Sequence, residues 1–140
     1  MVHISREAHE QMVAHAVAQY PLEACGLLAG PPGGEGAEVV RFYPCRNLAD
    51  SARVYTIDPH DHLRAERDAE AAGLEIVGVM HSHTHTQPYP SPTDVTEAPD
   101  PEWHYVIVSL REETAETRSF RIDTSAGMEE AVSEEHVELG

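Results

Sequence analysis

The segment Glu75-Ile76-Val77-Gly78-Val79-Met80-His81-Ser82-His83 decides the fold of this chain. Its first six residues are nearly all apolar, which is the pattern of a central strand buried on both faces. This strand runs directly into two histidines, and His85 follows as a third. Because side chains alternate along an extended segment, His81, His83 and His85 are expected on one side. Two imidazoles spaced in this way can hold one cation.

A carboxylate downstream of the histidines can complete a metal site. Residues 86–92 form a loop punctuated by proline, and Asp94 follows it. Neutral imidazole and carboxylate are suitable zinc ligands, and a catalytic zinc site keeps three protein ligands so that water takes the fourth position. If the loop folds back, Asp94 supplies the third ligand. Taken alone, the alternating histidines are better explained as a polar strand end or a pH-sensitive cluster, since an isolated histidine is more often a structural residue than a ligand.

The arrangement of these residues resembles the JAMM (MPN+) family of zinc metallopeptidases. The family signature, H-x-H followed by S-x-x-D, is matched by His81, His83, Ser91 and Asp94 at the family's spacing. Residues 21–30, PLEACGLLAG, look like the family's upstream segment, in which a glutamate precedes Cys-Gly and an apolar strand. The resemblance therefore extends over most of the chain.

The resemblance implies a role for each matching residue. His81, His83 and Asp94 take the places of the Zn2+ ligands, Glu23 that of the catalytic glutamate, and Ser91 that of the serine beside the substrate carbonyl. A carboxylate beside a zinc-bound water can accept its proton and pass it to the leaving amine, and a hydroxyl can donate to the oxyanion. Without the resemblance, Glu23 would be an ordinary exposed glutamate and Ser91 a turn residue.

The form of the signature indicates a narrower class of substrates. Eukaryotic members have proline after the second ligand histidine, whereas Thr84 stands there in this sequence, which resembles the bacterial branch. Some bacterial members release cysteine from the C-terminus of a small ubiquitin-like sulfur-carrier protein. The resemblance thus implies a zinc-dependent peptidase that hydrolyses the amide bond after the C-terminal Gly-Gly of such a carrier. The alternative is a catalytically silent MPN domain that serves as a scaffold or binding module, although silent members typically lack parts of the ligand set.

Helical and β patterns alternate along the chain and indicate an α/β (α+β) fold around one sheet. The resemblance implies the MPN fold, a mixed β-sheet flanked by helices and similar to that of the cytidine deaminases. Helices are expected at residues 5–20, 59–72 and 93–98, the first with Ser5 as its N-cap. Further strands are expected at residues 25–29, 39–43, 53–57, 104–110 and 117–122. A flexible Gly/Pro loop is expected at residues 30–36, and the acidic tail from residue 126 is poorly specified.

Size and charge limit the partners. A chain of 140 residues fits a single domain, residues 1–140, and its sequence leaves the oligomeric state open. Its formal charge of −16 argues against nucleic acid and anionic membranes as partners, and fits either a solvated surface or a cytosol of high salt. The sequence has neither a secretory signal nor an apolar run long enough to span a membrane, so a cytoplasmic protein is expected.

Several other residues invite simpler interpretations. His85 could support the site, contact substrate, be exposed or replace another ligand. Residues 58–62, DPHDH, are expected to cap a helix and not to bind metal. Cys25 is expected in the core, because an apolar strand raises the pKa of a thiol. Trp103 and Tyr105 border a predicted strand and are expected to be packing residues.

Overall fold

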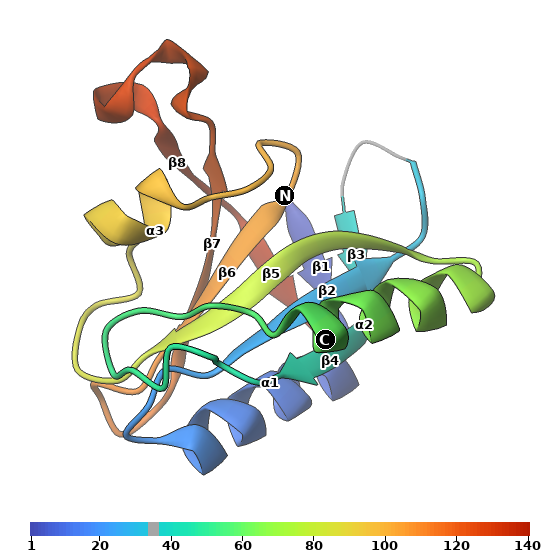
Figure 1. Ribbon diagram of the computed structural model, residues 1–140, viewed down its shortest axis with the longest axis horizontal. Coiled ribbons are helices and arrows are strands. Elements are labelled where there is room, and N and C mark those ends of the chain that lie inside the picture. The colour runs from blue at the N-terminus through green and yellow to red at the C-terminus, as the bar shows by residue number, and fades with distance from the viewer. Residues whose placement is uncertain (34–36) are drawn as a thin grey trace.

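A mixed sheet of six strands forms the centre of the protein, in the order β4-β2-β5-β6-β7-β8 (Figure 1). The computed structural model describes residues 1–33 and 37–140. The strands of this sheet are β2 (Cys25–Gly30), β4 (Arg41–Cys45), β5 (Glu75–His83), β6 (His104–Ser109), β7 (Glu116–Ile122) and β8 (Val132–Glu135). A mixed sheet with flanking helices confirms the α/β fold class predicted from the sequence.

β5 lies in the interior of this sheet, antiparallel to β2 and parallel to β6. Every residue from Gly78 to His83 is buried. Gly78 permits the close approach of β6, because a Cβ atom at this position would lie 2.2 Å from the carbonyl oxygen of His104. The predicted central strand is therefore confirmed, and it continues through both histidines of the motif.

The α-helices begin where the sequence provides capping side chains. They are α1 (Arg6–Gln19), α2 (Pro59–Ala71) and α3 (Pro92–Thr96). Ser5, Asp58 and Ser91 directly precede them, and each side chain accepts a hydrogen bond from a backbone N–H of the first turn. All three helices lie where the sequence predicts them, with ends that differ by at most a few residues.

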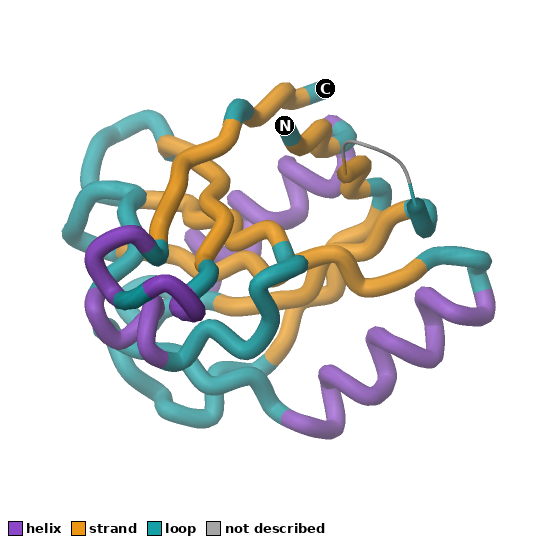
Figure 2. The backbone as a smooth tube through the Cα atoms, turned by 90° about the horizontal axis from the view of Figure 1, so that it is seen from above, coloured by secondary structure: helices purple, strands orange, loops and turns teal. Residues whose placement is uncertain are grey.

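Helices cover both faces of the sheet, and Figure 2 shows α1 and α2 on opposite sides of the strands. α1 packs Met12 into a core with Met80 of β5. α2 packs Ala65, and α3 packs Val95, into a second core with Val79. Because Val79 and Met80 are neighbours in a strand, their side chains point to opposite faces. The same alternation aims His81 at the face that carries α2 and α3.

A second, smaller sheet joins the two ends of the chain. It consists of β3 (Ala37–Val39), β1 (Val2–Ile4) and β9 (Val137–Leu139), in that order and all parallel. Because β1 and β9 are parallel, the N-terminus and the C-terminus lie at opposite ends of this small sheet (Figure 1). The sequence analysis missed β1, β8 and β9, because strands of three or four residues contain too few alternations to give a periodic signal.

The prediction of a strand at residues 53–57 is wrong. Among the described residues, this segment forms only an isolated bridge between Asn47 and Ile57. The Asn47 side chain takes the place of a neighbouring strand, since it accepts a hydrogen bond of 2.9 Å from the N–H of Thr56 and donates one of 3.0 Å to the carbonyl of Val54. A buried asparagine, and not a β ladder, therefore holds this loop.

Two other predicted segments are corrected in part. The strand predicted at residues 39–43 is divided, because Val39 ends β3 in the small sheet and Arg41 begins β4 in the large one. Residues 34–36 of the predicted Gly/Pro loop lie outside the described residues, and Gly30 still belongs to β2. The acidic tail contains β8, β9 and the 3-10 helix η2 (Met128–Glu130), and η1 (Thr124–Ala126) precedes it. None of the helices in the described ranges is long and apolar enough to cross a membrane.

Candidate metal centre

Two histidine side chains and one aspartate side chain converge at the C-terminal end of β5. The Nε2 atoms of His81 and His83 lie 3.2 Å apart, and Oδ2 of Asp94 lies 3.1 Å from the first and 3.3 Å from the second. All three residues are buried, with no more than 8% of their surface exposed. Within the described part of the chain they form a group that could hold a metal ion. The three predicted ligands are thus together in space.

The spacing of these atoms fits a tetrahedral metal ion. Zinc bonds to nitrogen and oxygen of about 2.0–2.2 Å separate neighbouring ligand atoms by about 3.3 Å. His83 Nδ1 lies 2.8 Å from the carbonyl oxygen of Gln87, so this nitrogen carries the ring hydrogen, and the Nε2 lone pair of the neutral ring points at Asp94. A lone pair and a carboxylate oxygen repel each other unless a proton or a metal ion lies between them. The residues present therefore fit a bound cation.

The protonation of the two rings follows from their surroundings. Burial lowers the pKa of His81 more than Asp94 raises it, so this ring is neutral near pH 7 and able to bind a metal. Burial also lowers the pKa of His83, but the hydrogen bonds to Asp94 and Gln87 raise it more. In the metal-free protein a proton on His83 can therefore occupy the place of the cation, and the two compete.

A helix cap explains the S-x-x-D spacing of the motif. The N–H of Ser91 donates to Asp94 Oδ2 at 2.8 Å, and the N–H of Asp94 donates to Ser91 Oγ at 3.1 Å, which together form a capping box at the start of α3. This box aims the carboxylate at the two imidazoles. Burial raises the pKa of Asp94, but hydrogen bonds with His81 and His83 lower it more, so the carboxylate remains ionised.

Glu23 lies beside this group, directly before β2. The N–H of Ser82 donates to the carbonyl of Ala24 at 2.9 Å, and the N–H of Ala24 donates to Ser82 Oγ at 2.7 Å. These bonds continue the antiparallel register of β2 and β5 and set Glu23 opposite His83. Only 3% of Glu23 is exposed, and its Oε1 atom has no hydrogen-bond partner among the described residues. Burial raises the pKa of this carboxyl to about 7 in the metal-free protein, although His83 lowers it in part.

The sequence analysis missed two residues that support the site. Tyr55 stacks on His81, with ring centroids 4.5 Å apart and planes at 19°. It comes from the loop that Asn47 holds, and no sequence pattern marks such a contact. Ser82 binds β5 to the segment that carries Glu23. The sequence contains a signal for this role, because Ser82 stands between the two motif histidines and alternation points its side chain to the opposite face.

His85 does not join the metal group. β5 ends at His83, so the alternation expected for a third histidine does not continue, and that expectation is wrong. The exposed ring of His85 instead places Nε2 3.1 Å from the hydroxyl of Tyr20 and Nδ1 2.9 Å from the hydroxyl of Thr84. Both of its ring nitrogens are thus engaged away from Asp94.

The structure confirms the core position of Cys25, the helix cap of Asp58 and the packing of Tyr105. Cys25 is fully buried, and burial raises the pKa of its thiol to about 12. Asp58 caps α2, while Asp61 accepts a hydrogen bond of 2.8 Å from the N–H of Arg46. Tyr105 is buried and donates its hydroxyl hydrogen to the carbonyl of Asp100 at 2.6 Å. These residues stabilise the fold around the site.

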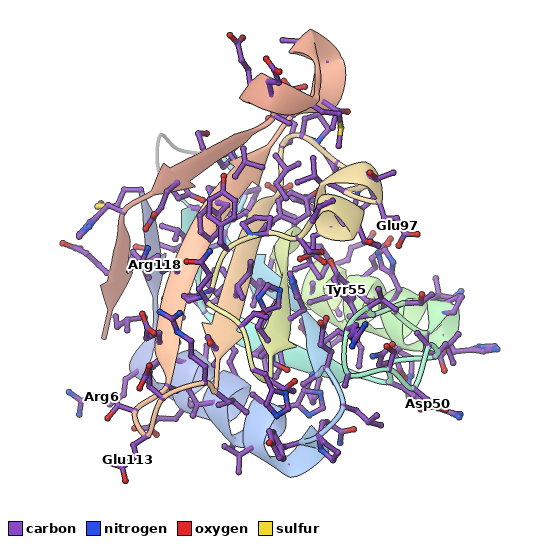
Figure 3. The ribbon with its side chains drawn as sticks, turned by 90° about the vertical axis from the view of Figure 1, so that its left-hand side faces the viewer. Arg6, Asp50, Tyr55, Glu97, Glu113 and Arg118 are labelled. Atoms are coloured by element: carbon purple, nitrogen blue, oxygen red, sulfur yellow. The ribbon has the colours of Figure 1, made fainter. Side chains whose placement is uncertain are left out.

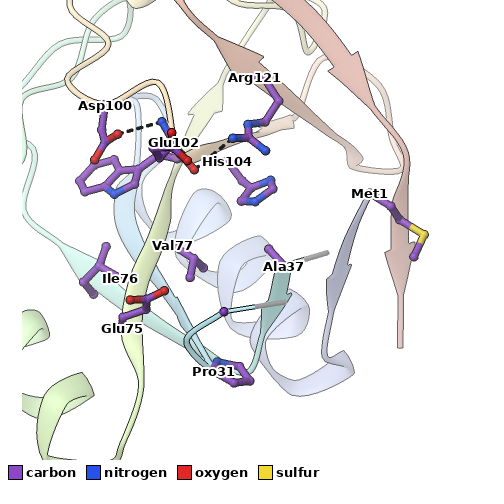
Figure 4. A pocket seen from close by; sticks show the side chains of 12 residues that line it. Met1, Pro31, Ala37, Glu75, Ile76, Val77, Asp100, Glu102, His104 and Arg121 are labelled. Carbon is purple, nitrogen blue, oxygen red and sulfur yellow. Dashed lines mark hydrogen bonds between the residues drawn. The ribbon is translucent and has the colours of Figure 1, made fainter. Parts of the chain in front are cut away.

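Two cavities lie at different places along β5. One, of about 250 Å³, adjoins the metal group and is lined by Asp94 and Tyr55, and Figure 3 shows Tyr55 between α3 and α2. The other, of about 400 Å³, lies at the start of β5, where Glu75 and Val77 face His104 and Arg121 (Figure 4). Of the candidate ligands, Asp94 lines the first cavity, and none of the three lines the second.

The chain is similar to known proteins along most of its length. A family model described as prokaryotic homologs of the JAB domain matches residues 5–123. The CysO-cysteine peptidase of Mycobacterium tuberculosis (strain ATCC 25618 / H37Rv) is 45% identical over 123 residues, which cover 87% of this chain and 83% of the relative.

Solved structures agree with this match. The solution structure of a protein from Desulfitobacterium hafniense superposes with a TM-score of 0.89 at 36% identity and covers 100% of this chain and 93% of its own. A JAB1/MPN domain protein from Archaeoglobus fulgidus has a TM-score of 0.58 at 19% identity, covers 97% of this chain and 96% of its own, and shows the shared fold. This chain therefore belongs to the family of prokaryotic JAB-domain homologues.

Proposed function

We propose that this protein is a zinc-dependent peptidase that cleaves the amide bond after the C-terminal Gly-Gly of a small ubiquitin-like sulfur-carrier protein and releases cysteine. The observation that carries the proposal is the convergence of His81 Nε2, His83 Nε2 and Asp94 Oδ2 at 3.1–3.3 Å. Glu23 lies next to this group with a buried carboxylate. Three protein ligands leave one tetrahedral position open, as a catalytic zinc site requires. The 45% identity to a CysO-cysteine peptidase supports the choice of substrate.

The side chains have distinct roles in this proposal. Zinc held by His81, His83 and Asp94 would polarise the scissile carbonyl and lower the pKa of a bound water to about 7. Glu23 accepts the proton of the attacking water and donates it to the leaving amine, since its buried carboxyl lies opposite His83 and beside the proposed ligands. Ser91 Oγ accepts the N–H of Asp94, so its own hydrogen is available to the oxyanion of the substrate.

The proposed substrate suits a site of this kind. A tail that ends in two glycines has no side chains near the scissile bond and can lie extended against the protein backbone. Polyubiquitin is expected to be a poor substrate, because a chain of 140 residues leaves little room for insertions that hold two ubiquitins.

The test is incubation of the zinc-loaded protein with a sulfur-carrier protein that ends in Gly-Gly-Cys. Mass spectrometry is expected to show loss of one cysteine residue, a chelator is expected to stop the reaction, and added zinc to restore it. A catalytically silent MPN domain would bind the carrier and leave its mass unchanged. Efficient cleavage of ubiquitin chains with no action on the carrier would contradict the proposed substrate.

A further inference from the structure

A cavity of about 250 Å³ opens beside the candidate metal centre. Its lining includes Tyr55, Ile57, Asp94 and Trp103, with the exposed Glu97 among them. Sites for whole small molecules usually measure about 300–1,000 Å³, so this space suits a single side chain. Asp94, one of the proposed ligands, lines this cavity, and Tyr55 lines it from the other side of its stack on His81, so the cavity adjoins the proposed reaction centre.

The charges around the cavity indicate which part of a substrate it accepts. Asp94 and Glu97 contribute carboxylates, and no Arg is among the described residues that line it. Nε2 of His62 lies 2.7 Å from the carboxylate of Glu66, which offsets whatever charge this histidine carries. In the uncleaved substrate the leaving amino acid has a free α-carboxylate and no free amine, and these acidic groups repel the carboxylate. The cavity therefore favours the carrier side of the scissile bond. Its acidic groups disfavour an acidic side chain, and an apolar side chain suits the apolar part of its lining, which consists of Val54, Ile57, Val79, Pro99 and Trp103.

The position along the carrier follows from its sequence, and this step rests on the proposed function. The last two residues of the carrier are glycines, which have no side chain to place in a cavity. The first side chain before the scissile bond belongs to the third residue, and an extended tail moves about 3.3 Å per residue away from the metal. We propose that the cavity binds an apolar side chain of the residue that directly precedes Gly-Gly and thereby selects the carrier.

The tryptophan of the chain provides a direct readout of this binding. Trp103 is the one Trp in the sequence, and it lines the cavity. Its fluorescence can be titrated with short peptides that end in X-Gly-Gly, where X is Leu, Ala or Glu. The Leu peptide is expected to change the emission and to bind about 10-fold more tightly than the Ala peptide, because it buries several more methyl and methylene groups. The Glu peptide is expected to bind more weakly than the Ala peptide.

Two matched variants test whether the cavity is responsible. Thr56 is exposed and lines the cavity, so Thr56→Phe should fill it and reduce the preference for Leu over Ala to less than about 2-fold. Thr114→Phe makes the same change at an exposed position in the turn next to Glu113, which Figure 3 places far from Tyr55 and Glu97, and should keep the preference. Glu97→Gln should improve binding of the Glu peptide.

The titration requires no turnover and is therefore independent of the cleavage assay. Equal affinities for the Leu and Ala peptides, absence of binding, or a preference that survives Thr56→Phe would each overturn the inference, even if the carrier is cleaved. A Leu preference that Thr56→Phe removes would support it, even if cysteine is not the residue released.

Discussion

Two groups, each of buried histidine and a carboxylate, lie near opposite ends of the parallel strands β5 and β6. At the start of β6, His104 Nδ1 lies 2.6 Å from Glu135 Oε2, which also accepts a hydrogen bond of 2.8 Å from Ser119. The N-terminal amino group lies 3.6 Å from the other oxygen of Glu135. At the end of β5, the ring nitrogens of His81 and His83 meet one oxygen of Asp94 instead. The same residue types therefore form two different arrangements.

The difference lies in how polar atoms are satisfied. Each contact around Glu135 pairs a donor with an acceptor, so the group is complete without any other atom. Around Asp94, two imidazole nitrogens meet one carboxylate oxygen, and both His81 Nδ1 and Glu23 Oε1 are buried without a partner in the described part of the chain. Composition alone would not distinguish the groups, whereas the convergence of three possible ligand atoms beside unpaired buried polar atoms indicates a cation site. Four variants or pairs of variants test this comparison.

The largest effect is expected when a ligand is removed. His81→Ala should reduce the zinc content from about one ion per chain to nearly none and abolish peptidase activity, because two remaining ligands hold the metal too weakly. His104→Ala, the matched change in the other group, should keep its zinc. Elemental analysis of both proteins measures this. Unchanged zinc in His81→Ala would mean that the assigned ligands are wrong.

The next largest effect is expected at Glu23. Glu23→Gln preserves the size of the side chain and removes the group that accepts a proton, so kcat should fall by about 10²–10⁴, or roughly 3–5 kcal/mol of barrier. Zinc content and carrier affinity should be retained, because the proposed role involves the attacking water and not the metal.

Single-turnover rates, carrier Kd and zinc content should be measured on one preparation of Glu23→Gln. Near wild-type turnover with zinc bound would exclude Glu23 as the acid–base residue. Loss of zinc would instead assign Glu23 a part in holding the metal.

A smaller effect, on stability and not on catalysis, is expected in the group around Glu135. Burial raises the pKa of Glu135, but hydrogen bonds from His104 and Ser119 lower it more, so the pKa lies below its usual value of 4.5. A carboxyl whose pKa is lower in the folded state stabilises the protein above the unfolded pKa, and this stabilisation is lost as the pH falls through the folded pKa. Glu135→Gln should therefore cost about 1–3 kcal/mol at pH 7 and clearly less at pH 3.

The neighbouring Glu134 provides the control for Glu135. Its side chain is 49% exposed and lies 3.5 Å from Arg118, so Glu134→Gln should change the free energy of unfolding by less than about 1 kcal/mol. Urea denaturation at both pH values measures all three proteins. Equal costs for the two variants, or a cost for Glu135→Gln that does not depend on pH, would contradict the role of Glu135.

The sequence predicts the parts of this site that lie on regular elements. β5 could be identified because a nearly continuous apolar run of this length is typical of a buried central strand, and alternation then places His81 and His83 together. Asp94 could be identified because a capping box fixes its distance from Ser91. The role of Glu23 came from the family resemblance, since nothing local distinguishes it from an exposed glutamate.

The contacts that the sequence could not predict are made by loops and by residues far apart in the chain. Tyr55 reaches His81 through a loop that the Asn47 side chain holds, and residues 53–57 have the apolar content of a strand without forming one. The pair of His104 and Glu135 joins positions 31 residues apart, on strands with one other strand between them. Such contacts are set by tertiary packing, and no local periodicity encodes them.

The smallest effect on activity is expected at Cys25, although it lies two residues from Glu23 and pairs with His81 across the sheet. Its thiol is fully buried, and burial raises its pKa to about 12, so at neutral pH it is neither a nucleophile nor a metal ligand. Cys25→Ala should leave zinc content unchanged and alter kcat by less than about 2-fold, at a cost of about 1 kcal/mol in stability. A thiol reagent should modify the native protein only at the rate at which it unfolds. Loss of zinc in Cys25→Ala, or a rapidly reacting thiol that only zinc protects, would mean that Cys25 belongs to the metal group. The metal site would then include a residue of β2 that is assigned here to the core.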